Sequence, residues 1–261
     1  RAREALILLR GTHELAVAHG IVEADRNTRT SLTFYEQFAD PAAGLAMARE
    51  GLEIASRRGS ASYGFLMVGN AVNSAIRVGE WPWATALLDE WLSRDITGGY
   101  FLELFVDRAV LSALAGRDSG VDLTEAEALL ANMTDLQYTS YCHWGRAWEA
   151  FGQGRLDEAR GRAESAASVT EYFAPISLPL AARAALWAGD APAAGALVSQ
   201  IERFVSRGQA ITLDHQTLGA GVAALAGRRA EAVAVYRDAL RGWHALGLAF
   251  DEAMDTLDIP I

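Results

Sequence analysis

The sequence contains no lysine, and all 23 of its basic residues are arginine. A P-loop needs a lysine to reach the β- and γ-phosphates, a protein kinase needs one on its third strand, and Schiff-base chemistry needs a neutral amine. The Gly-x-Ser-x-Gly elbow, the Gly-x-Gly-x-x-Gly loop and the Cys-x-x-Cys motif are absent as well. We therefore expect a protein that is not an enzyme and needs no cofactor.

Cysteine and long apolar runs are also scarce. Cys142 is the only cysteine, which excludes an intrachain disulfide and fits a reducing compartment. No uncharged apolar run of about 18 residues occurs, and the first residues, RAREALILLR, do not resemble a signal peptide. The formal net charge of -10 disfavours phosphate backbones and anionic lipid. These features predict a cytoplasmic protein that binds neither nucleic acid nor membranes.

What the sequence has in abundance is a repeated pair of short helices. The segment from His143 to Ala167 shows two helices that meet at Gly154, where the missing Cβ permits a left-handed turn. Small residues lie on the facing sides of this pair: Ala147, Ala150, Ala159, Ala163 and Ala166. Such a pair packs closely but buries little apolar surface of its own, so it needs another pair on each side.

The same pattern extends over the whole chain. Helices are expected at about residues 2–19, 23–38, 41–58, 62–78, 83–93, 100–115, 124–133, 176–188, 191–206, 212–226 and 229–246, in addition to the pair within 143–167. Thr124 and Glu127 form a capping box that predicts the start of the helix at 124. The turn glycines at 79, 116, 154, 189 and 227 are 37, 38, 35 and 38 residues apart, close to the tetratricopeptide period of about 34.

These observations predict one domain over residues 1–261. No Pro- or Ser-rich linker divides the chain, as expected for a continuous stack in which each unit contacts the next. The fold class we expect is all-α, a right-handed superhelical solenoid of antiparallel, tetratricopeptide-like helix pairs. Because the sequence starts without Met inside a helical pattern, we also expect it to be a fragment of a longer regulator.

Two segments carry a resemblance to known repeats. GRLDEARGRAESA at 154–166 and GRRAEAVAVYRDAL at 227–240 resemble the turn and second helix of tetratricopeptide repeats. The whole chain resembles the degenerate helical-repeat region downstream of the ATPase in bacterial signal-transduction proteins, both LuxR-type transcriptional regulators and class III nucleotide cyclases. The stretch from Arg241 to Asp251 resembles the closing segment of that region in the cyclase-linked group.

The resemblance implies a sensor or protein-interaction arm of a signalling regulator. Its partner would be a protein or peptide, or the attached ATPase and effector domains of the same polypeptide. In such stacks the first helix of each pair lines the concave surface, and a peptide would bind in that groove. The alternative is a small-molecule sensor, for example for a sugar. A deep, closed pocket would favour the small molecule, and a long, open groove would favour the peptide.

Two asparagines are candidate groove residues. Counting back six and nine residues from Gly79 leads to Asn73 and Asn70 on an otherwise apolar helix. Buried amides need hydrogen-bond partners. They would therefore bind a peptide backbone or a polar ligand, or else bond to neighbouring helices or water.

An aromatic band lies on the first helix of the fourth pair. Its members are Tyr138, Tyr141, Trp144, Trp148 and Phe151. Most of the band is expected in the core, but in an open groove Tyr141, Trp144 and Trp148 would form the apolar floor of a pocket. Arg183, from the next first helix, would supply a fixed positive charge to that pocket.

The remaining titratable residues suggest no catalytic or metal site. Glu103 and Asp107 share a helix face, and we expect them in a solvated acidic groove. His215, next to Asp214, is a candidate groove residue of the sixth pair, with a surface polar pair as the alternative. The five histidines include no pair spaced i, i+4, so no metal site is expected.

Overall fold

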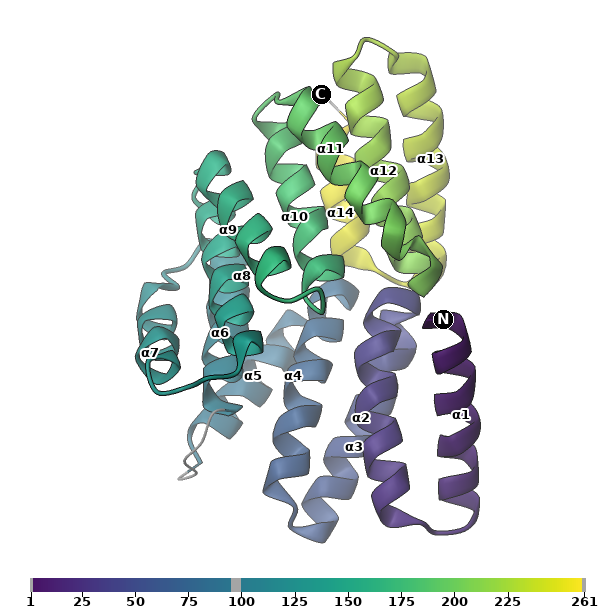
Figure 1. The fold of residues 1–261 in the computed structure, drawn as a ribbon, viewed down its shortest axis with the longest axis vertical. Coiled ribbons are helices and arrows are strands. Elements are labelled where there is room, and N and C mark those ends of the chain that lie inside the picture. Colours follow the sequence, from purple (N-terminus) through teal and green to yellow (C-terminus); the bar gives the residue numbers. More distant parts are fainter. Residues whose placement is uncertain (1, 95–99, 260–261) are drawn as a thin grey trace.

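The computed structural model describes residues 2–94 and 100–259, and within them the chain is helical throughout (Figure 1). The elements are α1 (Ala2–Ala18), α2 (Val22–Ala39), α3 (Pro41–Arg58), α4 (Ala61–Val78), α5 (Trp81–Leu92), α6 (Tyr100–Leu114), α7 (Gly120–Leu130), α8 (Leu136–Gly152), α9 (Leu156–Val169), α10 (Ala174–Trp187), α11 (Ala191–Ile201), the 3-10 helix η1 (Glu202–Arg207), α12 (Gln209–Leu225), α13 (Arg229–Leu246) and α14 (Ala249–Asp258). Among these helices, none has both the length and the apolar character needed to cross a membrane.

Left-handed glycines end α4, α6, α8, α10 and α12, the first helices of five pairs, as predicted. The five turn glycines all have positive φ: Gly79, Gly116, Gly154, Gly189 and Gly227. At Gly154 φ is 72°, and the N–H of Arg155 bonds back to the carbonyl of Ala150 at 2.9 Å. A side chain with a Cβ rarely adopts this conformation, so glycine sets the position of each turn.

Alanines allow the two helices of a pair to approach closely. Ala147 and Ala150 on α8 and Ala159, Ala163 and Ala166 on α9 are all fully buried. The predicted close packing of this pair is therefore confirmed. Each pair packs in turn on the next, as in α3 with α4, α6 with α8, and α9 with α10.

Two helix predictions need correction. Helix α7 begins at Gly120 and not at Thr124, because its first turn places Leu123 in the core with no exposed surface. The Thr124 hydroxyl bonds to the carbonyl of Gly120 inside the helix, at 2.8 Å, and does not cap it. The pattern also failed to predict α14, which follows the left-handed turn at Gly247.

The stack curves until its two ends meet. Helix α2 contacts α12 and η1, and α4 contacts α14. A Cβ atom at Gly208 would lie 2.2 Å from the Cα of Ala39 and 2.4 Å from the carbonyl oxygen of Phe38, so only glycine fits between η1 and the end of α2. The concave side is therefore enclosed by the chain itself.

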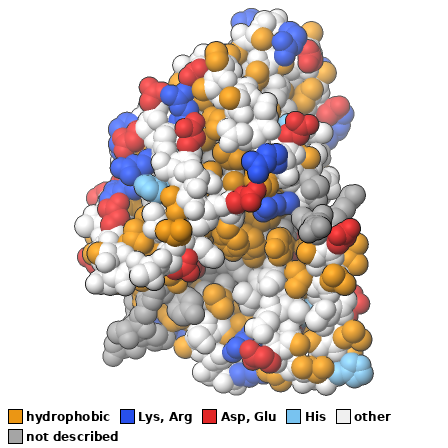
Figure 2. Space-filling model, in the orientation of Figure 1, with side chains coloured by type: hydrophobic (Ala, Val, Ile, Leu, Met, Phe, Trp, Pro, Cys, Tyr) orange, Lys and Arg blue, Asp and Glu red, His pale blue; other side chains and the backbone are white. Residues whose placement is uncertain are grey.

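Helix α14 occupies part of that concave side. It lies behind α10 and α12 in the view of Figure 1 and contacts α4, far from it in sequence. On the face shown in Figure 2, hydrophobic side chains gather in the central hollow, bordered by acidic and basic side chains. On this face the centre of the molecule is apolar, with charged side chains at its border.

Candidate functional site

A central cavity lies where the first helices converge. Its lining comprises Gln37, Asn73, Ile76, Arg77, Val110, Trp144, Trp148, Pro175, Ile176, Pro179, Leu180, Arg183, Asp214, Phe250 and Asp251. These residues belong to α2, α4, α6, α8, α10, α12 and α14, so all of them come from first helices or from the two ends of the stack. The cavity has a water-accessible volume of about 90 Å³. This is several times the space that one ordered water needs.

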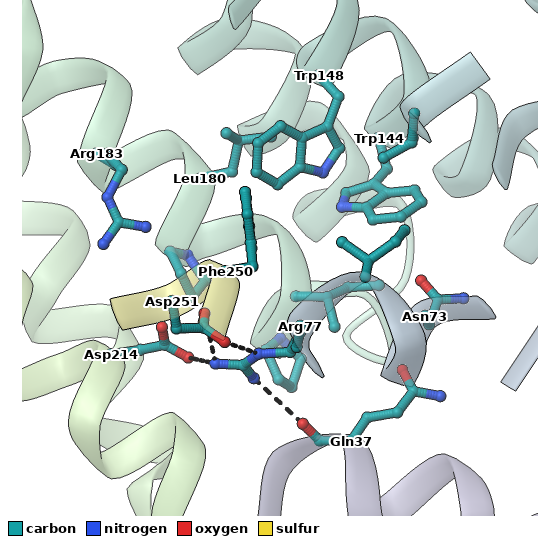
Figure 3. A pocket seen from close by; sticks show the side chains of 15 residues that line it. Gln37, Asn73, Arg77, Trp144, Trp148, Leu180, Arg183, Asp214, Phe250 and Asp251 are labelled. Carbon is teal, nitrogen blue, oxygen red and sulfur yellow. Dashed lines mark hydrogen bonds and ion pairs between the residues drawn. The ribbon is translucent and has the colours of Figure 1, made fainter. Parts of the chain in front are cut away.

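Two indoles form one wall of this central cavity. Trp144 is 5% exposed, and Trp148 packs against Phe250 with ring centroids 6.1 Å apart. In Figure 3 both indoles lie beside Leu180 and Phe250 at the edge of the cavity. The Nε1–H groups of both Trp144 and Trp148 are buried without a hydrogen-bond partner. A buried N–H normally finds an acceptor, so these two donors are unsatisfied inside the wall, and the wall presents mainly the apolar surface of the rings to the cavity.

The opposite wall is held by Arg77 of α4. Its guanidinium bonds to Asp251 at 2.9 Å and to Asp214 at 3.1 Å, and it also donates to the carbonyl of Gln37 at 3.2 Å, as Figure 3 shows. Burial alone would lower the pKa of Arg77, but the two carboxylates outweigh it and raise that pKa, which keeps the guanidinium charged. These contacts join α2, α4, α12 and α14 at one point.

Arg183 of α10 is also saturated by acids. It donates to Asp258 at 3.1 Å and to Asp255 at 3.0 Å, and all three groups are buried. Trp187 and Trp243 add indole N–H bonds to Asp258 and Asp255. Arg183 thus lines the central cavity, as expected for a fixed positive charge, but the two carboxylates that α14 brings to it balance that charge.

We refer to these two arginines and their four aspartates together as the arginine cluster. Its members are Arg77, Arg183, Asp214, Asp251, Asp255 and Asp258. Each member lies in the interior and has at least one partner of opposite charge. The cluster therefore fastens α14 to the concave side and leaves no member free for a ligand.

A side chamber adjoins the central cavity. Its lining comprises Thr30, Ser31, Phe34, Tyr35, Gln37, Leu66, Asn70, Asn73, Glu103, Gln137, Tyr141, Tyr172, Phe173 and Ile176. It shares Gln37, Asn73 and Ile176 with the central cavity, so these residues stand between the two spaces. The rings of Phe34 and Tyr172 stack in parallel with centroids 4.2 Å apart.

Two carboxylates of α6 lie at this side chamber. Glu103 lines it, and Asp107, one turn further along, is fully buried. The expectation of a solvated acidic groove is therefore wrong for Asp107. Burial raises the pKa of Glu103 to about 7, and the charge of Asp135 adds to that rise. Burial, together with the charge of Glu103, raises the pKa of Asp107 well above its ordinary value.

The predicted asparagines lie at the junction but differ in their bonding. Asn70 donates to Thr33 Oγ1 at 2.8 Å and to the carbonyl of Thr30 at 3.2 Å, so it ties α4 to α2. Asn73 donates to the carbonyl of Gly69 at 3.0 Å and approaches the hydroxyl of Tyr141 at 3.5 Å. Both line the side chamber, and Asn73 also lines the central cavity.

The structure thus brings together six of the seven predicted site residues. Asn70, Asn73 and Tyr141 line the side chamber, and Asn73, Trp144, Trp148 and Arg183 line the central cavity. His215 is half-buried and lines neither space; its neighbour Asp214 takes that position, because the two lie on different sides of α12.

Sequence reasoning missed the contribution of α14 and α2. Phe250, Asp251, Met254, Asp255 and Asp258 recur at helical spacing, and this signal could have predicted an amphipathic helix facing the groove. No sequence pattern could have predicted that Gln37 lines both spaces, because its position there depends on how far the stack curves. In the described parts of the chain, no group of three His, Cys, Asp or Glu side chains is placed to hold a metal ion.

Comparison of the sequence with protein-family models and with curated proteins gives no match.

Proposed function

We propose that this chain is a non-catalytic sensor module that binds a small molecule in the central cavity. The observation that carries the proposal is the half-open, mostly apolar space between the converging first helices, with the indoles of Trp144 and Trp148 as one wall. Ligand sites are typically concave and apolar with a few polar groups that fix orientation.

The position of the central cavity suggests how binding would be transmitted. Residues from seven helices touch it, including both ends of the stack. A ligand that fits one curvature of the proposed right-handed, tetratricopeptide-like superhelix would shift the population toward that curvature. Effector domains attached to such a module in a bacterial signalling regulator would respond to the shift.

A peptide or protein partner is the second candidate, and α14 itself favours it. This helix lies on the concave side with Phe250 and Met254 packed inward and its aspartates bound to Arg77 and Arg183. Helix-in-groove recognition uses the same apolar anchors and charge pairs. A partner helix would have to replace α14, whereas a small molecule fits beside it, and this difference favours the small molecule.

The test is a screen of small metabolites by thermal shift on the intact chain, followed by calorimetric titration of each hit. We expect Trp144→Phe and Trp148→Phe to weaken binding about 5- to 30-fold each, since each removes part of the apolar wall that contacts the ligand. His215→Ala, outside both spaces, is the matched control and should bind as the parent does. If no metabolite stabilises the chain, or if both tryptophan variants bind every hit unchanged, the proposal fails.

A further inference from the structure

The side chamber differs from every other buried acidic position in the described structure. Seven acidic residues are buried: Glu36, Asp107, Glu149, Asp214, Asp251, Asp255 and Asp258. Six of them contact an arginine. Asp107 is the exception: it contacts no arginine in the described structure, and the only polar side chain near enough to favour its ionised form is the neutral amide of Asn73, which lies outside good hydrogen-bond geometry. Since an unpaired buried charge is strongly unfavourable, the chain compensates its other buried acids and leaves this one open.

Glu103 adds a second carboxylate at the same place. A Cβ atom on Gly69 of α4 would lie 3.5 Å from Glu103 Oε2 and 3.8 Å from Asp107 Oδ2. Both carboxylates of α6 therefore converge on one point of α4, with Glu103 at the wall of the side chamber and Asp107 behind it.

The groups that face these carboxylates bring no positive charge. They are Asp135 at the start of α8, Tyr141 on α8, Tyr172 before α10 and the amide of Asn73 on α4. No arginine or histidine is among the residues that line the side chamber. An entering cation would therefore meet the carboxylate of Glu103, with Asp107 behind it; Arg207 approaches the lining only at Tyr35 and does not act on either carboxylate.

The walls of the side chamber suit an organic cation better than a hydrated ion. Phe34 and Tyr172 present a stacked pair of rings, and Tyr35 and Tyr141 lie nearby in the lining. Ammonium and guanidinium groups are attracted to aromatic faces. Past Asn73, the central cavity offers the apolar surface of Phe250, Leu180 and the Trp144 ring.

We propose that the ligand is an organic amine or guanidinium whose cation binds Glu103 in the side chamber, with Asp107 as a supporting charge, and whose apolar body extends past Asn73 into the central cavity. This inference rests on the proposed small-molecule function and names its ligand class. Glu103 is the direct contact, and Asp107 acts through the field it adds one helical turn away.

Binding of such a cation has a proton signature. Free Glu103, with its pKa raised to about 7, carries its proton part of the time at neutral pH, and burial holds the pKa of Asp107 high as well. A bound cation favours the ionised carboxylates and lowers both pKa values. Binding at pH 7 therefore releases protons, which a neutral ligand at the same place would not cause.

The experiment compares 4-phenylbutylamine with 4-phenylbutanol, its neutral analogue, by calorimetric titration of the intact chain at pH 7 in buffers of different ionisation enthalpy. We expect the amine to bind at least 10-fold more tightly and to release protons. Glu103→Gln should weaken the amine about 10- to 100-fold, the loss expected for a charge-assisted hydrogen bond, and leave the alcohol unchanged. Asp107→Asn should keep the fold and reduce the proton release.

The outcomes separate this inference from the proposed function. Equal affinity for amine and alcohol, or amine binding that neither releases protons nor responds to Glu103→Gln, overturns the cationic ligand. In that case binding of the alcohol that weakens in Trp148→Phe still supports a small-molecule site in the central cavity. If amine and alcohol both fail to bind, the cationic ligand class is overturned, and the metabolite screen decides the proposed function independently.

Discussion

The arginine cluster and the side chamber are both buried and acidic, but their charge balance is opposite. In the arginine cluster, burial raises the pKa of Asp255 to about 7 while Arg183 opposes the rise. In the side chamber, burial and a neighbouring acid act together to raise the pKa of Asp107. In the arginine cluster, the positive charge that balances the acids comes from the chain itself. In the side chamber, a bound ligand would have to provide it.

This difference assigns the two regions to different tasks. The arginine cluster joins α4, α10, α12 and α14 through charge-assisted bonds, so it fixes the enclosed shape of the concave side. The side chamber has Glu103 at its wall and Asp107 behind it, and among its described lining residues there are aromatic rings but no arginine or histidine. The arginine cluster and the side chamber thus lie close together in the same interior. Their charge balance distinguishes them, whereas their burial does not.

The largest effect is expected in the arginine cluster. Arg183→Met leaves Asp255 and Asp258 buried without their cation, and we expect the free energy of unfolding to fall by about 3–5 kcal/mol. Urea denaturation at pH 7 measures it. The matched control is the triple variant Arg183→Met, Asp255→Asn, Asp258→Asn, which should recover much of the loss because no unpaired charge remains. A loss below about 1 kcal/mol in the single variant would show that α14 is not held by these charges.

The opposite sign is expected at Asp107. Asp107→Asn removes a carboxyl group that resists ionisation in the folded state, so we expect the free energy of unfolding at pH 8 to rise by about 1–3 kcal/mol. The gain should largely disappear near pH 3, where the parent carboxyl is mostly protonated in the unfolded state as well. Denaturation at the two pH values checks this, and destabilisation at pH 8 would mean that a cation within the chain already compensates Asp107.

Ionisation of Glu103 should also make the free energy of unfolding depend on pH, with a smaller effect than that of Asp107. Its pKa rises from 4.5 in the unfolded chain to about 7 in the folded one, so the folded state binds more protons between these values. The free energy of unfolding contributed by Glu103 therefore falls as the pH rises through this window, and Glu103→Gln should remove a decrease of about 1–2 kcal/mol. Thermal unfolding across pH 4–8 tests it; parallel pH profiles for parent and variant would contradict the assignment.

An exposed pair provides the baseline for both regions. Glu53 and Arg57 on α3 lie 3.7 Å apart with side chains 71% and 68% exposed. Glu53→Gln should change the free energy of unfolding by less than about 0.5 kcal/mol, because water and salt screen such pairs. Urea denaturation measures this change as well, and an effect as large as that of Arg183→Met would remove the distinction between buried and exposed charge.

The local repeat was predictable because each part of it depends on nearby residues. Gly154 ends its helix through its own left-handed conformation, independently of the rest of the fold. The alanines of α8 and α9 meet because helical spacing puts them on facing sides. The same spacing placed Trp144 and Trp148 on the inner face of a first helix, and the structure has them at the central cavity.

The charge balance of the interior was not predictable in the same way. In the sequence, Arg183 and Asp107 are ordinary charged positions on helices. Only the described structure shows that α14 brings two carboxylates to Arg183 and that no arginine pairs with Asp107. Asp258 lies 75 residues after Arg183 in the sequence. Their contact therefore depends on the orientation of every helix between them.

Except for α14, the amino-acid sequence by itself determined the helices, their pairing and which helix of each pair faces inward, because turn glycines and residue spacing act over a few residues. Tertiary structure alone decided how far the stack curves, that Gly208 meets the end of α2, and which buried charges are compensated. Small rotations between successive pairs accumulate along the chain, and only their total brings distant charges into contact or keeps them apart.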